Sequence, residues 1–104
     1  MRNYKALITL PAQSDLDEIF NWYENQKNGL GKSFISDFDK TLNKIISNPF
    51  YPSTIEEDAR IASLKRFPYY IVYRIVEKQQ HLRIIAIIHQ HRNPILIHSR
   101  AVPI

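Results

Sequence analysis

Two apolar stretches with a short polar connection between them constrain the fold more than any other feature of this chain. They are YYIVYRIV (Tyr69–Val76) and LRIIAII (Leu82–Ile88), and the connection EKQQ (77–80) is followed by His81. β-Branched and aromatic residues predict strands, and the short polar connection predicts an antiparallel hairpin. Strict alternation gives each strand two faces, one of which must lie under other elements. In the first strand Tyr69, Ile71, Tyr73 and Ile75 share a face; in the second, Leu82, Ile84, Ala86 and Ile88 oppose Arg83, Ile85, Ile87 and His89.

The first half of the chain predicts a short strand at 4–10 followed by two helices. Pro11 suits the first turn of a helix, and Ser14 with Asp17 has capping-box spacing for a slightly later start. This helix is expected to end near Gly29, and a second to run over 30–47. Their apolar stripes are Ala12, Leu16, Ile19, Phe20 and Tyr23 in the first, and Phe34, Phe38, Leu42, Ile45 and Ile46 in the second.

With a further strand at 60–65, the element order is β-α-α-β-β-β. This order predicts an α+β fold, with an N-terminal strand and a helical hairpin packed on a mostly antiparallel sheet. We expect Tyr69 and Tyr73 to pack in the core under the helices. The other face of the sheet is expected to be open, apolar in its middle and edged by arginines, and to need a partner. The length of 104 residues fits a single domain over 1–104.

Composition narrows the class of protein. The chain has no cysteine, which excludes a disulfide scaffold and thiolate chemistry, and no apolar run approaches the roughly 18 residues of a membrane span. We therefore expect a cytoplasmic protein without membrane association. Residues 1–58 contain six basic and nine acidic residues, a net charge of −3, whereas residues 59–104 contain eight basic residues and one acid, a net charge of +7. This asymmetry indicates an acidic or polyanionic partner.

The second hairpin strand runs into a polar cluster, in the segment IIAIIHQHRNP (84–94). His89 and His91 would point the same way on a strand, but no third metal ligand is spaced with them and Arg92 would repel a cation. No glycine-flanked serine supports a hydrolytic triad, and the two glycines form no phosphate-binding loop. Cleavage of RNA by His and Arg groups and a purely structural role remain open. We favour His89 and Arg92 as anchors for the end of the strand, close to a surface that a partner uses.

Several segments, taken in order, resemble the RelE/ParE superfamily of toxins from type II toxin–antitoxin pairs, and most closely the ParE side. They are DLDEIFNWY (15–23), LGKSFISDFD (30–39), Asn48-Pro49, RFPYYIVYRI (66–75) and AIIHQHRNP (86–94). The Phe-Pro-Tyr pattern followed by an aromatic-rich strand falls on Phe67, Pro68, Tyr69 and Tyr73. The His-x-x-Arg-x-Pro ending falls on His89, Arg92 and Pro94.

The resemblance implies a growth-inhibiting toxin, of the kind linked to plasmid stabilization, that forms a hetero-oligomer with an antitoxin encoded next to it. ParE-like members act by binding DNA gyrase, without enzymatic activity or cofactor. RelE-like members are ribosome-dependent endoribonucleases that cleave mRNA, and a non-toxic binding domain is a third alternative. The candidate catalytic residues for cleavage are His89, Arg92, His98 and Arg74. The candidate partner-binding residues, which would face acids of the antitoxin, are Arg60, Arg66, Arg74, Arg83 and Arg92.

Overall fold

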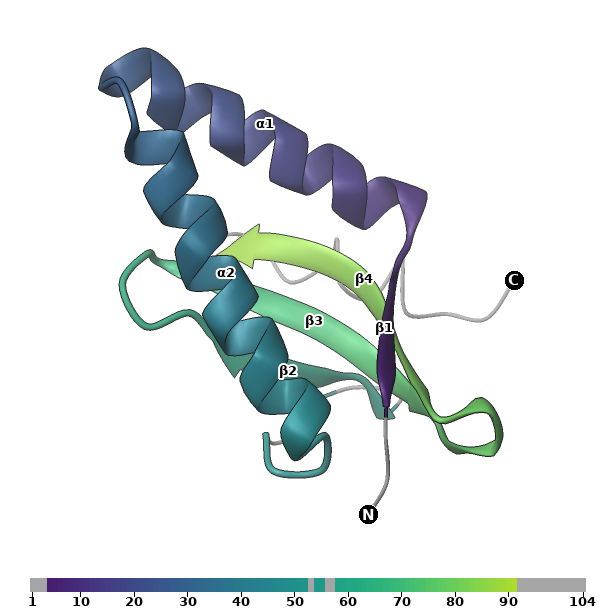
Figure 1. Ribbon diagram of the computed structural model, residues 1–104. Coiled ribbons are helices and arrows are strands. Elements are labelled where there is room, and N and C mark those ends of the chain that lie inside the picture. Colours follow the sequence, from purple (N-terminus) through teal and green to yellow (C-terminus); the bar gives the residue numbers. More distant parts are fainter. Residues whose placement is uncertain (1–3, 53, 56–57, 92–104) are drawn as a thin grey trace.

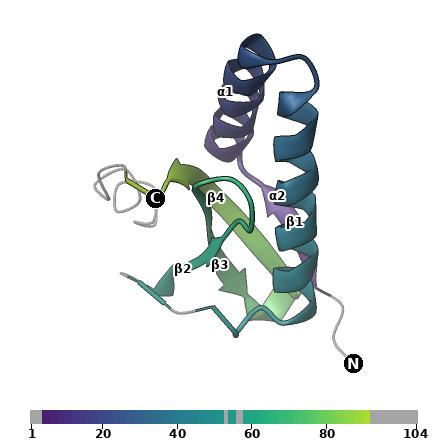
Figure 2. The same ribbon diagram turned by 90° about the vertical axis from the view of Figure 1, so that its left-hand side faces the viewer.

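A helical hairpin covers one face of a four-stranded sheet in the computed structural model, which describes residues 4–52, 54–55 and 58–91 (Figures 1 and 2). The elements are β1 (Lys5–Ile8), α1 (Leu10–Gln26), α2 (Leu30–Ser47), β2 (Arg60–Ser63), β3 (Tyr69–Val76), the short 3-10 helix η2 (Glu77–Gln79) and β4 (His81–His89). The predicted α+β class and element order are confirmed. No helix in the described ranges has the length and apolar character to cross a membrane.

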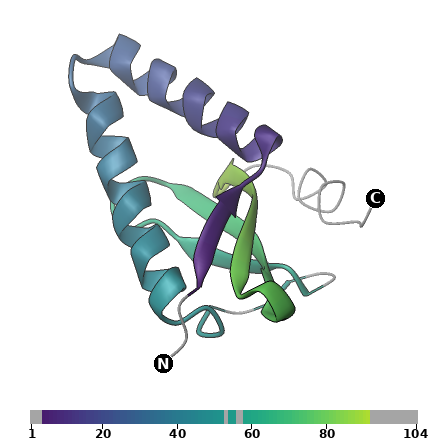
Figure 3. The same cartoon turned by 45° about the vertical axis from the view of Figure 1, so that its right-hand side comes forward.

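The strands lie in the order β1-β4-β3-β2 (Figure 3). β3 pairs antiparallel with β2 and with β4, whereas β1 runs parallel to β4, so the sheet is mixed and mostly antiparallel, as predicted. The β3–β4 hairpin closes through η2 and Gln80, whose positive φ of 52° is a left-handed conformation. Ile8 pairs with Ile84, where β1 ends, so β1 leaves the last part of β4 uncovered at this edge of the sheet.

A β-bulge in β4 interrupts the alternation that the sequence suggested. Val72 pairs with Ala86 but Tyr73 pairs with Ile84, so Ile85 is the extra residue of β4 in this register. An extra residue in one strand reverses the faces of the residues beyond it. Ile87 therefore joins Ile84 in the core under the helices, and the expectation that it faces the opposite side is wrong.

The second face of the sheet is not the open apolar surface that the sequence predicted. Val72, Ile85, Ala86 and Ile88 are between 0 and 7% exposed and form a second buried cluster with Ala59. Ile55, Ile61 and Tyr70 pack against this cluster in the described part of the chain. Alternation alone identifies an apolar face but does not reveal how far neighbouring side chains of the same chain bury it.

The first helix starts earlier than its capping-box spacing suggested. Thr9 is the N-cap, and its side-chain oxygen accepts a hydrogen bond from the backbone N–H of Ala12 (3.4 Å). Pro11 lies in the first turn as predicted, whereas Ser14 is inside the helix and caps nothing. The same Thr9 hydroxyl donates to the carbonyl oxygen of Ile84 (2.9 Å), so one side chain both begins α1 and ties it to β4.

Close approach of the two helices depends on glycine. A Cβ at Gly31 would lie 2.8 Å from the backbone oxygen of Phe20, too close for any other residue without movement of α1. Gly29, the N-cap of α2, has the left-handed φ of 89° expected at this turn. The carboxylate of Glu24 accepts hydrogen bonds from the backbone N–H groups of Gly29 (2.8 Å) and Gly31 (2.9 Å), satisfying donors at the start of α2.

Aromatic rings fill the space between the helices and the sheet. Tyr69 and Tyr73 are 7% and 0% exposed, which confirms that they are core residues. Tyr23 packs edge-on against Phe67 with ring centroids 4.9 Å apart, and Phe34 against Tyr69 at 5.5 Å. The predicted apolar stripes therefore do meet over the sheet, and they hold α1 above the end of the β3–β4 hairpin.

Candidate functional site

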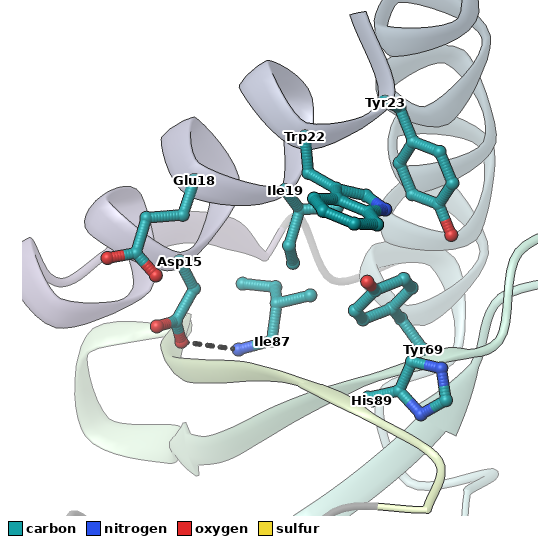
Figure 4. A pocket seen from close by; sticks show the side chains of 8 residues that line it. All are labelled: Asp15, Glu18, Ile19, Trp22, Tyr23, Tyr69, Ile87 and His89. Atoms are coloured by element: carbon teal, nitrogen blue, oxygen red, sulfur yellow. Dashed lines mark hydrogen bonds between the residues drawn. The ribbon is translucent and has the colours of Figure 1, made fainter. Parts of the chain in front are cut away.

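A cavity of about 470 Å³ lies between α1 and the ends of β3 and β4 (Figure 4). We call it the α1–β4 cavity. It lies beyond the end of β1, where α1 rather than a strand lies beside the last residues of β4. Its lining combines acidic, aromatic and aliphatic side chains: Asp15, Glu18, Ile19, Trp22, Tyr23, Tyr69, Ile87 and His89.

The β-bulge places His89 at this cavity. With strict alternation His89 would face away from the helices, but the extra residue in β4 turns it toward α1. Its ring packs edge-on against Tyr69 with centroids 5.2 Å apart. Its Nδ1 accepts a hydrogen bond from the backbone N–H of His91 (3.2 Å), so His89 does anchor the end of its strand.

One end of the cavity carries negative charge. Asp15 and Glu18 are three residues apart on α1 and therefore share a helical face. Asp15 Oδ2 accepts a hydrogen bond from the backbone N–H of Ile87 (3.0 Å), on the part of β4 that β1 does not cover. This contact fixes one carboxylate, while Glu18 is on the exposed surface of the helix. Figure 4 shows both carboxylates at the opposite end of the cavity from the rings of Tyr69 and His89.

Sequence reasoning missed Trp22 as a residue of this site, as it did Asp15 and Glu18. Trp22 is the only tryptophan of the chain, and its side chain is 60% exposed on the outer part of α1. The helical pattern assigns Ile19 and Tyr23 to the core, but Trp22 falls between the apolar stripe and the polar face. That position, together with Asp15 and Glu18 on the same helix, is the signal that could have identified the site.

The structure describes four of the candidate partner-binding arginines, and these four do not gather in one place. Arg60 is occupied within the chain, because its Nη1 donates to the carbonyl oxygens of Phe50 (3.0 Å) and Pro52 (2.6 Å). Its guanidinium also lies over the Phe50 ring, 5.2 Å from the centroid. These contacts assign Arg60 a structural role in holding the loop after α2.

Arg66 belongs to a basic surface formed by α2 and the β2–β3 connection. It lines a second cavity, of about 400 Å³, together with Ser36, Asp37, Lys40, Thr41, Asn43, Lys44 and Lys65. Asp37 is only 4% exposed, and its Oδ2 accepts hydrogen bonds from the backbone N–H groups of Arg66 (2.8 Å) and Phe67 (2.9 Å). The buried carboxylate therefore fixes the connection that carries Lys65 and Arg66, a role that the apolar stripe of α2 did not indicate.

Arg74 and Arg83 are directly opposite each other on β3 and β4. The side chain of Arg83 is exposed, whereas Arg74 is half-buried and its Nε and Nη2 are shielded from solvent. Neither of these two nitrogens has a hydrogen-bond partner in the structure as described. The paired positions of Arg74 and Arg83 therefore place two positive charges on neighbouring strands, on the same face of the sheet.

The remaining candidates, Arg92 and His98, lie outside the described residues, so their relation to His89 stays a prediction. Among residues 4–52, 54–55 and 58–91, the structure contains no group of three or more His, Asp or Glu side chains arranged to hold a metal ion.

A family model described as "ParE toxin of type II toxin-antitoxin system, parDE" matches residues 6–94. A search of curated protein sequences returned no match.

Solved structures share the fold at low sequence identity. A chain of the chromosomal ParDE system from P. aeruginosa is 19% identical with a TM-score of 0.72, over 84% of this chain and 96% of that one. A chain of the RelBE2 toxin–antitoxin complex from Mycobacterium tuberculosis is 18% identical with a TM-score of 0.57, over 84% and 98%. A double mutant of the E. coli toxin RelE in the free state is 13% identical with a TM-score of 0.67, over 95% and 94%.

Proposed function

Because this chain belongs to the ParE toxin family of type II toxin–antitoxin systems, we propose that it arrests growth by binding DNA gyrase in the cytoplasm and is neutralised by an antitoxin encoded beside it. The match covers the described elements except Lys5, the first residue of β1, and reaches Pro94, the end of the motif noted in the sequence. The proposed mechanism is binding without chemistry, with no cofactor.

The negative charge of the cavity that His89 lines is the observation that favours binding over RNA cleavage. A general acid or base for phosphodiester cleavage has to lie close to a phosphate and to groups that stabilise its negative charge. His89 instead shares its cavity with Asp15 and Glu18, whose carboxylates would repel a phosphate. The Nδ1 of His89 is also engaged with the backbone of His91. This environment is suited to contact with a protein.

The arginine pair on β3 and β4 is the surface that best suits an acidic segment of the antitoxin. A carboxylate bound at the exposed side chain of Arg83 would also neutralise the charge of Arg74, which is directly opposite on β3. The net charge of +7 in residues 59–104 would attract such a segment from a distance. Arg60 is a weaker candidate because its Nη1 is already bonded to loop carbonyls.

The experiment that tests the mechanism compares single alanine variants of the candidate catalytic residues, His89, Arg92, His98 and Arg74. Each protein is purified with its antitoxin, separated from it and checked for folding by circular dichroism. Supercoiling by purified gyrase and cleavage of ribosome-bound mRNA are then measured. We expect wild type to inhibit supercoiling and to leave the message intact, with single variants losing inhibition in small steps.

Two results would overturn the proposal. Removal of a proton-transfer group typically lowers an enzymatic rate by about 10²–10⁴-fold. Clean cuts in the message that one substitution abolishes, with gyrase unaffected, would identify a ribosome-dependent endoribonuclease and its catalytic residue. A wild-type protein that acts on neither target and does not arrest growth would identify a non-toxic binding domain.

A further inference from the structure

The α1–β4 cavity combines features that indicate a specific class of ligand. Its volume of about 470 Å³ falls within the range of roughly 300–1,000 Å³ typical of ligand-binding clefts. Three aromatic side chains, Trp22, Tyr23 and Tyr69, form part of its wall. Trp22 is 60% exposed there, and an exposed tryptophan at the wall of a cavity gains contact area when a ligand covers it.

Both the aromatic rings and the carboxylates of the lining attract cations. The face of an aromatic ring, above all of tryptophan, attracts positive charge, and the carboxylates of Asp15 and Glu18 do so more strongly. An anion would be repelled by these two carboxylates. A neutral apolar ligand would remove water from them without replacing their hydrogen bonds, which costs free energy.

An arginine side chain satisfies both parts of the lining at once. Its planar guanidinium stacks on aromatic faces and donates several hydrogen bonds in fixed directions to carboxylates. Its aliphatic stem can lie against Ile19 and Ile87, which also line the cavity. Asp15 is held by the backbone N–H of Ile87, so its charge is fixed at the cavity before any ligand arrives.

We propose that the α1–β4 cavity binds an arginine side chain of the antitoxin. The inference rests on the proposed function only for the identity of this partner, which family membership provides. The surface would complement the Arg74–Arg83 pair, which suits an acidic group of the same partner. An antitoxin bound at two surfaces of opposite charge has only one favourable orientation, because a reversed segment would set like charges together at both.

The first test uses Trp22 as a reporter, since it is the only tryptophan of the full chain. The protein is titrated with N-acetyl-arginine amide while tryptophan fluorescence is followed, and N-acetyl-citrulline amide serves as the uncharged ligand of the same shape. Glu18→Gln should weaken arginine amide binding about fivefold or more. The matched control is Asp17→Asn, because Asp17 is exposed on the same helix, bonds the side chain of Gln13 and does not line the cavity.

A saturable response to arginine amide that citrulline amide does not give, and that Glu18→Gln alone weakens, supports the inference. Equal responses to both ligands, no saturable response, or equal effects of Glu18→Gln and Asp17→Asn would overturn it. Both substituted side chains are exposed, so we expect both variants to fold, and circular dichroism checks this.

The second test identifies the arginine by double-mutant cycles with the antitoxin. Glu18→Gln is combined with alanine at each arginine of the antitoxin in turn, and the dissociation constant of each complex is measured. We expect one antitoxin arginine whose replacement by alanine raises the dissociation constant by a factor at least fivefold smaller with the Glu18→Gln variant than with wild type. Additive effects at every arginine would refute the assignment. Neither test depends on toxicity, so failure of the gyrase proposal and failure of this inference are distinguished.

Discussion

Replacement of Arg74 by methionine is expected to stabilise the free protein while it weakens the complex with the antitoxin. Nε and Nη2 of Arg74 are buried without a hydrogen-bond partner in the structure as described. Each unsatisfied buried donor costs about 1–3 kcal/mol. The side chain is only half-buried, so the lower end of this range applies to each nitrogen, and about 2 kcal/mol is recovered when both are removed.

The facing arginine adds to this effect. Arg83 is directly opposite Arg74, and like charges in this arrangement destabilise a sheet by roughly 0.2–1 kcal/mol. Methionine keeps most of the aliphatic stem, so packing changes little. The free energy of unfolding should therefore rise by about 2–3 kcal/mol, which is a large fraction of the roughly 5–15 kcal/mol typical of small domains.

Urea unfolding of the isolated protein, followed by circular dichroism, measures this change. Lys78→Met is the control, because Lys78 is exposed in η2 and its replacement should alter stability by less than about 0.5 kcal/mol. An Arg74→Met protein less stable than wild type would show that the guanidinium finds hydrogen-bond partners in solution, and the reasoning would fail.

Substitution of Arg74 should weaken binding of the antitoxin, although it stabilises the free protein. If an antitoxin carboxylate is paired with Arg74, Arg74→Ala should cost about 2–5 kcal/mol of binding free energy, measured by titration calorimetry. Lys27→Ala, at the exposed end of α1, should cost far less. Equal losses for the two variants would place the antitoxin on the helical hairpin instead.

Three further predictions concern stability and are checked by chemical unfolding. Asp37→Ala should cost about 3–5 kcal/mol because it removes the acceptor for two backbone N–H groups, and Asp37→Asn, which keeps an acceptor oxygen, should cost less than half as much. Gly31→Ala should cost about 1–3 kcal/mol because its Cβ would lie 2.8 Å from a carbonyl oxygen of α1, whereas exposed Lys32→Ala should be nearly neutral. Burial raises the pKa of Tyr73 to about 12, an effect that Arg60 partly opposes, and the phenol donates to Pro49 O (2.6 Å). The pKa of this phenol in the unfolded chain is about 10, so folding favours its neutral form. The free energy of unfolding of wild type should therefore exceed that of Tyr73→Phe by a constant amount below pH 10. This difference should shrink by about 2–3 kcal/mol as the pH rises to 12.

The sequence by itself determined the elements and their order. β3 is observed over the residues predicted for it, Tyr69–Val76, and α2 ends where Asn48-Pro49 predicts. These signals are local, since apolar periodicity, turn residues and glycine positions act within a few residues of one another. The family resemblance was also contained in the sequence, and the family match over residues 6–94 confirms it.

Only the tertiary structure decided which chemical groups meet. The bulge at Ile85 brings His89 to the α1–β4 cavity, and a change of register is a property of two paired strands that the pattern of one strand does not contain. The bond from Ile87 to Asp15 joins residues 72 positions apart, and that from Arg66 to Asp37 joins residues 29 apart. In the sequence these acids look like solvated charges on helices. They become fixed acceptors because folding places backbone N–H groups beside them. Burying a backbone N–H group without an acceptor would cost free energy.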